Sequence, residues 1–373
     1  MVKTTARLGV GLVGSGFMGR AHAFAFNAVS QIFDPPLRPD LAVLADADLK
    51  LAEGAARRLG FSKAVGDWRK LVEDSSVDVV SITTPNHLHK PIALAALEAG
   101  KAVYCEKPLA ATLADAKEMA EAARGRVTLV GFNYLKNPIV GLAREIATSG
   151  EIGEIVAFRG IHAEDYMTDP ASPHSFRTDP AGGGGVLMDL GSHIVSLARH
   201  LVGPIAEISA ATATVHKTRP SASGPRPVEV DDHGHFLARF ANGALGTISA
   251  SWVTPGRKMQ LDFELVGTRG SLVFTQERFN ELKLYAGEGK GRDGFKTLLA
   301  GPDMPPYGNF CPAPGHQLGF NDLKTIEVAH LIQAIAGKER ASPDFQEAYE
   351  IQRVIAAALA SANERAWVEV ARL

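Results

Sequence analysis

Two apolar runs in the first third of the chain each end in residues that could do chemistry. The stretch TPNHLH, Thr84–His89, follows Val77–Thr83, and the stretch EKP, Glu106–Pro108, follows Ala102–Cys105. If both runs are parallel strands, both stretches lie at the carboxyl edge of the sheet, where ligands bind in open α/β folds. A lysine in such a cleft is costly to desolvate unless it has a partner or a task. For a single residue, a solvated lysine at a strand end is the ordinary interpretation.

A second candidate pair is Asp189 and His193, which stand four residues apart in a segment predicted to be helical, Val186–Leu201. On a helix this spacing puts both side chains on one face. An acid and an imidazole placed in this way can hold one hydroxyl group together. A buried histidine in a structural helix is the competing interpretation. Both residue types also ligate zinc, but no third ligand stands at a telling spacing, so we expect no metal.

A glycine-rich motif, GSGFMG at Gly14–Gly19, directly follows the apolar run Arg7–Val13 and opens a helical pattern. Gly14 permits a tight turn, Gly16 lets the backbone approach a pyrophosphate, and Gly19 lets the helix pack on the strand. The anion then binds free N–H groups at the positive end of the helix dipole. In this strand–turn–helix context the motif predicts a dinucleotide site.

An acidic residue at the end of the second predicted strand, Asp46, is expected to accept hydrogen bonds from the adenosine ribose. Its separation from the glycines exceeds the usual ~20 residues, which we attribute to an inserted loop over Asp34–Pro39. Its carboxylate would repel a 2′-phosphate, and no arginine follows to bind one, so NAD is favoured over NADP. The alternative is that Asp46 only caps the next helix, although Asp48 is better placed for that role.

The elements that must position these residues alternate between strand and helix in the first third of the chain. Their apolar runs lack polar alternation, which is typical of strands covered on both faces of a parallel sheet. Gly60, Gly100 and Gly125 each follow a helical segment, as helix C-caps require. The pattern predicts right-handed βαβ units in a doubly wound α/β sheet. The expected strands are Arg7–Val13, Leu41–Ala45, Val77–Thr83, Ala102–Cys105 and Thr128–Gly131, and the expected helices are Met18–Val29, Leu49–Leu59, Lys90–Ala99 and Leu113–Arg124.

Beyond residue 132 the pattern becomes that of an α+β domain. Alternating or β-branched segments joined by turns such as Asn242-Gly243 predict an antiparallel sheet. We therefore expect two domains, 1–131 and 132–373. The expected strands of the second are Ile205–His216, His233–Phe240, Ala244–Trp252, Met259–Val266 and Ser271–Phe274, and its helices are Ile139–Ser149, Val186–Leu201, Asp322–Ala336 and Phe345–Asn363.

The composition of the 373 residues excludes several classes of protein. Apolar residues make up 46% and charged residues 21%, and the formal net charge is −2, so the chain as a whole does not attract nucleic acid or an anionic membrane. The two cysteines, Cys105 and Cys311, are far apart and have no metal-like spacing, which fits free thiols in a reducing compartment. Without a signal-peptide pattern or a bilayer-length apolar stretch, we expect a cytoplasmic protein.

In this order, the motifs resemble those of the Gfo/Idh/MocA oxidoreductase family. Glu-Lys-Pro at the fourth strand combined with Asp-x-x-x-His is specific, and the resemblance spans nearly the whole chain. It implies an NAD-binding Rossmann domain followed by a domain with a large, open, mostly antiparallel sheet, which often forms a homodimer or homotetramer interface. The matching residues are Gly14–Gly19, Asp46, Thr84–Asn86, His89, Glu106–Pro108, Asp189 and His193.

The resemblance also implies roles for individual residues. Lys107, Asp189 and His193 would be catalytic, with Lys107 and His193 binding the reacting hydroxyl, and the peptide before Pro108 is often cis in the family. The implied cofactor contacts are Gly14, Gly16, Phe17, Met18, Asp46, Thr84, Pro85, Asn86, His89, Glu106, Lys107, Asn133 and Arg177. The implied further substrate ligands are His162, Glu164, Asp165 and Arg177.

The expected reaction oxidises one secondary hydroxyl of a sugar, anhydrosugar or cyclic polyol, with the proton passing to Lys107. His193 could instead be the base, with Lys107 as a fixed positive charge that stabilises the developing alkoxide; we favour Lys107. An NAD-dependent glycosidase of the same fold and a non-catalytic dinucleotide sensor are the alternatives. A sensor would be expected to lose the lysine and the acid, and both are present here.

Overall fold

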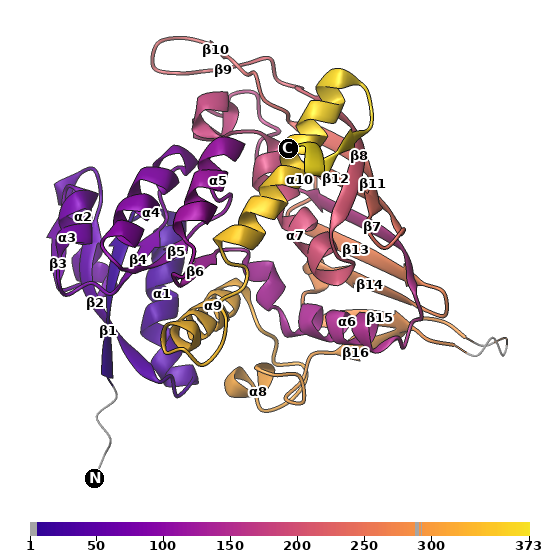
Figure 1. Ribbon diagram of the computed structural model, residues 1–373, viewed down its shortest axis with the longest axis horizontal. Helices are drawn as coiled ribbons and strands as arrows, with labels where there is room; N and C mark the ends of the chain where they lie inside the picture. The colour runs from indigo at the N-terminus through magenta and orange to yellow at the C-terminus, as the bar shows by residue number, and fades with distance from the viewer. Residues whose placement is uncertain (1–5, 288–290, 292) are drawn as a thin grey trace. The chain divides into compact units, whose positions relative to one another are not determined.

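The computed structural model describes residues 6–287, 291 and 293–373. They form two compact units, and Figure 1 labels the helices and strands of each. The first contains the chain up to Lys136 together with Gly319–Tyr349, and the second contains Asn137–Leu318 and Glu350–Leu373. None of the helices among these residues is long and apolar enough to cross a lipid bilayer.

The first unit is built on a six-stranded parallel sheet with the strand order β3-β2-β1-β4-β5-β6. This is the order of a Rossmann fold, in which the strand order reverses between β1 and β4. The predicted doubly wound sheet is therefore confirmed. Its strands are β1 (Ala6–Val13), β2 (Leu37–Ala45), β3 (Lys63–Val65), β4 (Val79–Ile82), β5 (Ala102–Cys105) and β6 (Thr128–Val130).

The connecting helices end where the glycines predict. Gly60, Gly100 and Gly125 have left-handed φ values of 91°, 77° and 74°, which a Cβ atom would disfavour. The Asp48 side chain caps the N-terminus of α2 by accepting from the backbone N–H groups of Lys50 and Leu51. The helices are α1 (Phe17–Ile32), α2 (Leu49–Leu59), α3 (Trp68–Glu73), α4 (His89–Glu98) and α5 (Leu113–Ala122).

The inserted loop that we expected over Asp34–Pro39 is shorter than predicted. Helix α1 continues to Ile32 and strand β2 begins at Leu37, so only residues 33–36 connect them. Pro39 lies in β2 opposite Leu8 of β1, and β3 pairs with β2 only from Val43 onward. The strand therefore has one neighbour at Pro39, which is where a sheet tolerates a residue without an N–H group.

The late helix expected at Asp322–Ala336 forms as α9 (Phe320–Ile335), but it belongs to the first unit. It packs against α1, and its Val328, Leu331 and Ile332 join the core of the Rossmann sheet. A single boundary at residue 131 does not describe this path. Helix α9 returns to the first unit because it is buried on most sides and must therefore be covered by other elements.

The second unit contains a nine-stranded sheet in which only the β7–β12 pair is parallel among the described strands. The large, mostly antiparallel sheet is thus confirmed. In sheet order its strands are β16 (Lys296–Leu299), β15 (Glu281–Tyr285), β14 (Ser271–Thr275), β13 (Gln260–Gly267), β7 (Ile155–Ala163), β12 (Leu245–Ser251), β11 (His233–Phe240), β8 (Ile205–Ala213) and β17 (Val368–Glu369).

Helices pack on one face of this sheet, where α6 and α7 lie in Figure 1. The predicted Asn242-Gly243 hairpin joins β11 to β12, with Gly243 at a φ of 89°. The expected strand Ile205–His216 stops at Ala213, because the Asp232 carboxylate accepts from the backbone of residues 215 and 216 and turns the chain. The remaining elements are α6 (Pro138–Ser149), α7 (Ser192–Leu201), β9 (Thr218–Arg219), β10 (Arg226–Pro227), α8 (Tyr307–Phe310) and α10 (Phe345–Glu364), which begins in the first unit.

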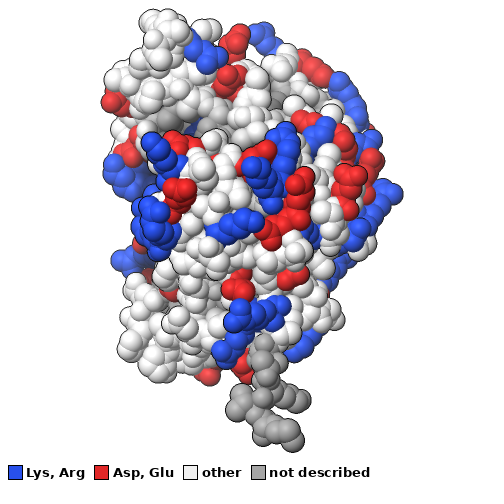
Figure 2. All heavy atoms as spheres, turned by 90° about the vertical axis from the view of Figure 1, so that its left-hand side faces the viewer, with Lys and Arg blue, Asp and Glu red and all other residues white. Residues whose placement is uncertain are grey.

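Charged side chains of both signs alternate over the face shown in Figure 2. In the first unit, ion pairs such as Lys63–Asp74 and Lys90–Asp115 have N–O distances of 2.7 Å. A surface of mixed charge agrees with the net charge of −2. It gives a nucleic acid or an anionic membrane no extended basic field to bind on this face.

Candidate active site

The glycine turn after β1 has the geometry that a pyrophosphate requires. Gly14 has a φ of 99°, and a Cβ atom on Gly19 would meet the Gly14 carbonyl oxygen at 2.1 Å. A Cβ atom on Gly16, in contrast, would have nothing within 4 Å. Gly14 and Gly19 are therefore fixed by the fold, whereas the space beside Gly16 is open at the N-terminus of α1. Phe17 and Met18 begin that helix, and Phe17 is 64% exposed.

Asp46 directly follows β2 and lies beside this turn. Its Oδ2 atom accepts hydrogen bonds from the backbone N–H of Ser15 at 3.0 Å and from the Ser15 hydroxyl at 2.5 Å. Because Asp48 caps α2, the interpretation of Asp46 as a helix cap is wrong. Its carboxylate instead lies against the glycine turn, where the sequence predicts the adenosine ribose.

Apart from Glu327 Oε1, two polar atoms in the first unit are buried without a hydrogen-bond partner among the described residues: Thr84 Oγ1 and Asn133 Nδ2. An unpaired buried polar group costs about 1–3 kcal/mol. Both residues are expected cofactor contacts, so a bound dinucleotide with its own donors and acceptors fits them. Pro85 and Asn86, the next two residues after Thr84, begin the turn that leads into α4.

His89 holds two loops together. Its side chain is fully buried, with Nε2 3.0 Å from the Thr84 carbonyl oxygen and Nδ1 3.0 Å from the Pro108 carbonyl oxygen. Burial lowers the pKa of His89, so the imidazole is neutral and donates to one of the two carbonyls. Because both ring nitrogens face the backbone, we assign His89 to positioning the loops after β4 and β5.

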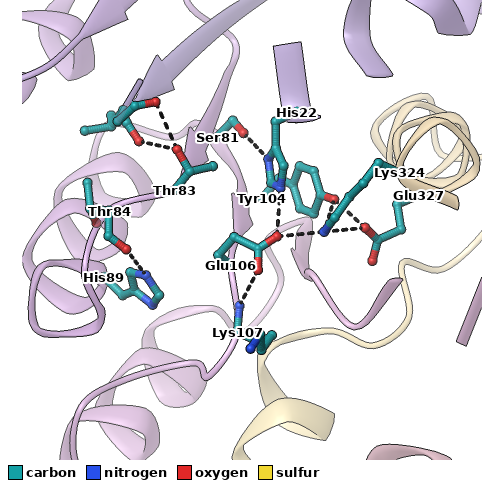
Figure 3. A network of polar contacts seen from close by, with 12 residues as sticks. His22, Ser81, Thr83, Thr84, His89, Tyr104, Glu106, Lys107, Lys324 and Glu327 are labelled. Atoms are coloured by element: carbon teal, nitrogen blue, oxygen red, sulfur yellow. Dashed lines mark hydrogen bonds and ion pairs between the residues drawn. The ribbon is translucent and has the colours of Figure 1, made fainter. Parts of the chain in front are cut away.

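Glu106 follows β5 and lies in a buried polar network (Figure 3). Its Oε1 atom is 2.9 Å from His22 Nε2 and 2.6 Å from Lys324 Nζ, and its Oε2 atom accepts from the backbone N–H of Lys107 at 3.2 Å. Burial alone would raise the pKa of Glu106, but the charge of Lys324 and the hydrogen bond from His22 outweigh it and hold the pKa well below its usual range. The carboxylate is therefore an anion.

The other members of this network are also buried. Lys324 Nζ contacts Glu327 Oε2 at 2.9 Å and Tyr104 Oη at 3.3 Å, and Tyr104 donates to Glu327 at 2.5 Å. Burial lowers the pKa of His22 to about 4, so its neutral ring donates to Glu106 and accepts from Ser81. We did not predict this network from the sequence. The available signal was a Lys and a Glu three residues apart among the apolar residues of the predicted helix Asp322–Ala336.

Lys107 is half-buried and is the next residue after Glu106, whose carboxylate accepts from its backbone N–H. The Lys107–Pro108 peptide bond is cis, as the resemblance implies. The first unit thus brings the glycine turn, Asp46 and Lys107 to the carboxyl edge of one parallel sheet, which is where the topology places ligands.

In the second unit the expected pair Asp189 and His193 does not lie on a regular α-helix. Residues Leu187–Gly191 form a π-helical turn before α7 begins at Ser192. The Asp231 carboxylate accepts from the Leu187 backbone N–H at 2.8 Å and anchors the start of this turn. A π turn inside a helix re-aims side chains and is often found at functional sites.

Asp189 is the centre of a polar cluster in the second unit. Its Oδ2 atom accepts from Tyr166 Oη at 2.9 Å and from Arg177 Nε at 3.2 Å. Burial of its hydroxyl end and the charge of Asp189 raise the pKa of Tyr166 well above its usual value, so the hydroxyl remains a donor. Arg177 was predicted, whereas Tyr166 was not, because a single tyrosine carries no spacing signal.

His162 lies next to this cluster. Its Nδ1 is 3.0 Å from the Leu190 carbonyl oxygen and its Nε2 is 3.2 Å from Glu164, and its ring centroid is 5.6 Å from that of His193. The structure therefore brings His162, Glu164 and His193 together. Asp165, which follows β7, instead accepts from Lys258 Nζ at 2.6 Å and from the Gly256 backbone N–H, both in the segment after β12.

Comparison with known proteins agrees with this geometry. Residues 8–134 match the model of the oxidoreductase family with an NAD-binding Rossmann fold, and residues 140–273 match that of the GFO/IDH/MocA C-terminal domain. Levoglucosan dehydrogenase of Pseudarthrobacter phenanthrenivorans is 40% identical over 98% of this chain and 99% of its own length. The 1,5-anhydro-D-fructose reductase of Ensifer adhaerens is 34% identical over 62% of this chain and 68% of its own.

Solved structures give the same result. A levoglucosan dehydrogenase in complex with NADH and L-sorbose superimposes with a TM-score of 0.95 at 40% identity, over 98% of this chain and 99% of that one. An NAD-binding oxidoreductase from Klebsiella pneumoniae superimposes with a TM-score of 0.94 at 46% identity, with the same coverage. The chain therefore belongs to the Gfo/Idh/MocA family of NAD-binding oxidoreductases.

Proposed function

We propose that this chain is an NAD-dependent dehydrogenase that oxidises one secondary hydroxyl of a sugar-like substrate, with an anhydrosugar of the levoglucosan type as the first candidate. The observation that carries the proposal is the likeness, over 98% of the chain, to a levoglucosan dehydrogenase in complex with NADH and levoglucosan, with a TM-score of 0.94. The hydrogen-bonding residues around Asp189 support a polyhydroxylated ligand.

The residues that would hold the dinucleotide are those of the first unit. Gly14, Gly16 and the N-terminus of α1 would bind the pyrophosphate, and Asp46 would bind the ribose and disfavour a 2′-phosphate. Thr84 and Asn133 would use their unpaired polar atoms toward the nicotinamide half. When bound, the nicotinamide accepts the hydride.

We assign the proton transfer to Lys107. Its amine would accept the proton that leaves the hydroxyl as the hydride departs. Asp189, held by Tyr166 and Arg177, and His193 would bind and orient the same hydroxyl. His193 as the base, with Lys107 as an electrostatic stabiliser, is the other division of roles.

A substrate panel tests the activity. NADH absorbance would be followed with levoglucosan, monosaccharides and cyclic polyols, each with NAD and with NADP. The proposal expects net NADH formation with levoglucosan or a close anhydrosugar, and slower turnover with NADP. Cleavage of a glycoside without net NADH would favour the glycosidase alternative, and no reduction with any of these compounds would contradict the proposal.

We further propose that the protein is a cytoplasmic homo-oligomer that associates through the sheet of the second unit. Burial alternates along β11, so that every second side chain is exposed. Leu237 on this strand and Leu245 on β12 are 50% and 54% exposed, and two leucines on the same face of neighbouring strands support an interface. The free thiols of Cys105 and Cys311 fit a reducing compartment.

A further inference from the structure

Lys324 is a buried charge that the proposed reaction does not use. It lies on α9, has no exposed surface, and belongs to the same compact unit as Lys107. An ammonium group in such a place is tolerated only when other groups compensate its charge and all its hydrogens are bonded. The contacts of this lysine therefore show what keeps it there.

The three acceptors around Lys324 match the three hydrogens of its ammonium group. Its Nζ atom contacts Glu106 Oε1 at 2.6 Å, Glu327 Oε2 at 2.9 Å and Tyr104 Oη at 3.3 Å. The shortest contact is to Glu106, the residue that precedes Lys107. Figure 3 shows Lys324 extending from α9 to this carboxylate.

Glu106 divides its two oxygens between the network and the backbone. Oε1 is held by Lys324 and His22, and Oε2 accepts from the backbone N–H of Lys107. The carboxylate is thus fixed on one side and fixes the start of the Lys107 residue on the other. If the Glu106 side chain changed its rotamer, the Lys107 N–H would lose its acceptor and the position of Lys107 would be less firmly fixed.

We infer that Lys324 is a positioning residue for the reaction. It fixes the Glu106 carboxylate, which accepts from the backbone N–H of Lys107, and so fixes the position from which the Lys107 side chain extends. This inference rests on the proposed role of Lys107 in proton transfer. The alternative is a purely structural role, in which the ion pair only stabilises the packing of α9 against β5. The two differ in what happens when both charges are removed together.

The experiment compares Lys324→Met, Glu106→Gln and the double variant in the full-length enzyme, with levoglucosan and NAD as reactants. Lys90→Met is the matched control, because this half-exposed lysine also pairs with two carboxylates, Asp115 and Glu118. We expect Lys324→Met to lower kcat about 10- to 100-fold, the cost of a small misplacement of a reacting group. The KM for NAD should stay unchanged, and the control should keep wild-type kcat.

The double variant separates positioning from structure. Removing both charges leaves Glu106 without a mismatch; Glu327 loses its ammonium partner, but burial raises its pKa and favours its neutral form, so we expect the Tm to return part of the way toward that of wild type. Its kcat should remain low, because the neutral amide is a weaker acceptor for the Lys107 N–H than the carboxylate. If Lys324→Met does not fold, kcat and Tm are compared between the double variant and Glu106→Gln. In Glu106→Gln, Lys324 still pairs with Glu327.

The pH profile gives a readout that a purely structural role would not change. The titratable groups that face Glu106 are His22 from α1, Lys324 and Glu327 from α9, His89 from α4, and its neighbours Tyr104 and Cys105. Without Lys324, burial raises the pKa of Glu106, so the carboxylate takes up a proton as the pH falls. The kcat of Lys324→Met should then fall further on the acid side, and this limb should be absent from the double variant.

The outcomes are distinguishable from a failure of the proposed function. Lys107→Met measured in parallel must lose turnover; wild-type turnover in that variant would overturn the proposed role of Lys107, and this inference with it, while leaving the dehydrogenase activity in place. If Lys107→Met is inactive, wild-type kcat in the folded double variant, or in Lys324→Met itself, would overturn the inference alone. Low kcat with a partly recovered Tm in the double variant would support it.

Discussion

At the residue scale, the strongest feature of the second unit is a carboxylate that is held by two donors. Asp189 Oδ2 accepts from both Tyr166 and Arg177, and one of these donors is charged. Charge-assisted hydrogen bonds of this kind fix a side chain more firmly than neutral ones. A carboxylate held in one rotamer can orient a substrate hydroxyl without losing entropy at each turnover.

Tyr166→Phe tests this arrangement. Hydrogen bonds to charged groups contribute about 1.5–3 kcal/mol when buried, and Tyr166 is 41% exposed, so the smaller effect applies. We expect kcat/KM for the sugar to fall roughly tenfold, while the KM for NAD does not change. Steady-state kinetics with Tyr285→Phe as a control measures the effect. Unchanged kcat/KM would show that the tyrosine does not support Asp189.

Site residues that stand in a sequence motif could be predicted, whereas those outside a motif could not. Asp189, His193 and Lys107 follow from spacing and from their positions after strands. Tyr166 and Lys324 do not, because their partners are distant in the chain: Lys324 and Glu106 are separated by 218 residues. Such pairs depend on packing that no local pattern encodes.

At the element scale, the strand–turn–helix of the dinucleotide site separates glycines that the fold needs from a glycine that the ligand needs. Gly19 is packed against the Gly14 carbonyl, whereas the position of a Cβ atom on Gly16 is open. The φ of Gly16 is −66°, so its backbone is one that alanine adopts without strain.

Two alanine variants should therefore fail in different ways. Gly19→Ala places a methyl group 2.1 Å from a carbonyl oxygen and should lower the free energy of unfolding by about 1–3 kcal/mol. Gly16→Ala should keep the wild-type Tm but weaken NAD binding about tenfold or more, because the methyl group occupies the space left for the pyrophosphate. Thermal unfolding and NADH fluorescence titration measure the two effects, and normal NAD affinity in Gly16→Ala would contradict the assignment.

The π-helical turn at Leu187–Gly191 depends on a buried acid with an unusual titration. Burial raises the pKa of Asp231 to about 6, with a smaller contribution from the charge of Asp232, although backbone N–H groups favour the anion. The folded chain therefore binds this proton more tightly than the unfolded chain. Stability falls as the pH rises through the interval between the ordinary value of 3.8 and about 6.

Asp231→Asn removes this titration. We expect the variant to gain stability relative to wild type as the pH rises through that interval, by about 3 kcal/mol in total. Denaturant unfolding on either side of the interval measures the difference. Asp303→Asn, at an exposed position, is the control. A difference between Asp231→Asn and wild type that does not change with pH would contradict the raised pKa.

At the scale of the whole molecule, the chain crosses between its two units three times, after Lys136, Leu318 and Tyr349. The composition, the alternating elements and the turn glycines were enough to predict both sheets, because each depends on local periodicity. The return of α9 to the first unit was not predicted, because its sequence pattern does not specify which core the helix joins.

The proposed association through the second sheet is also a property of the whole molecule. Leu237→Lys places a charge in the middle of the exposed face of β11, where burial in an interface would make it costly. We expect light scattering to show a homo-oligomer for wild type and a smaller species for the variant, with the Tm of each unit largely kept. A monomeric wild-type protein would contradict the proposal.

The proton-transfer role of Lys107 is the claim on which the account depends, and single-turnover kinetics of Lys107→Met test it most directly. The substitution keeps the length of the side chain and removes its ability to exchange a proton. With levoglucosan and NAD, we expect hydride transfer to slow by several orders of magnitude, whereas the Kd for NADH and the Tm remain those of wild type. Hydride transfer at a near-normal rate in this variant would contradict the assignment and leave His193 as the base.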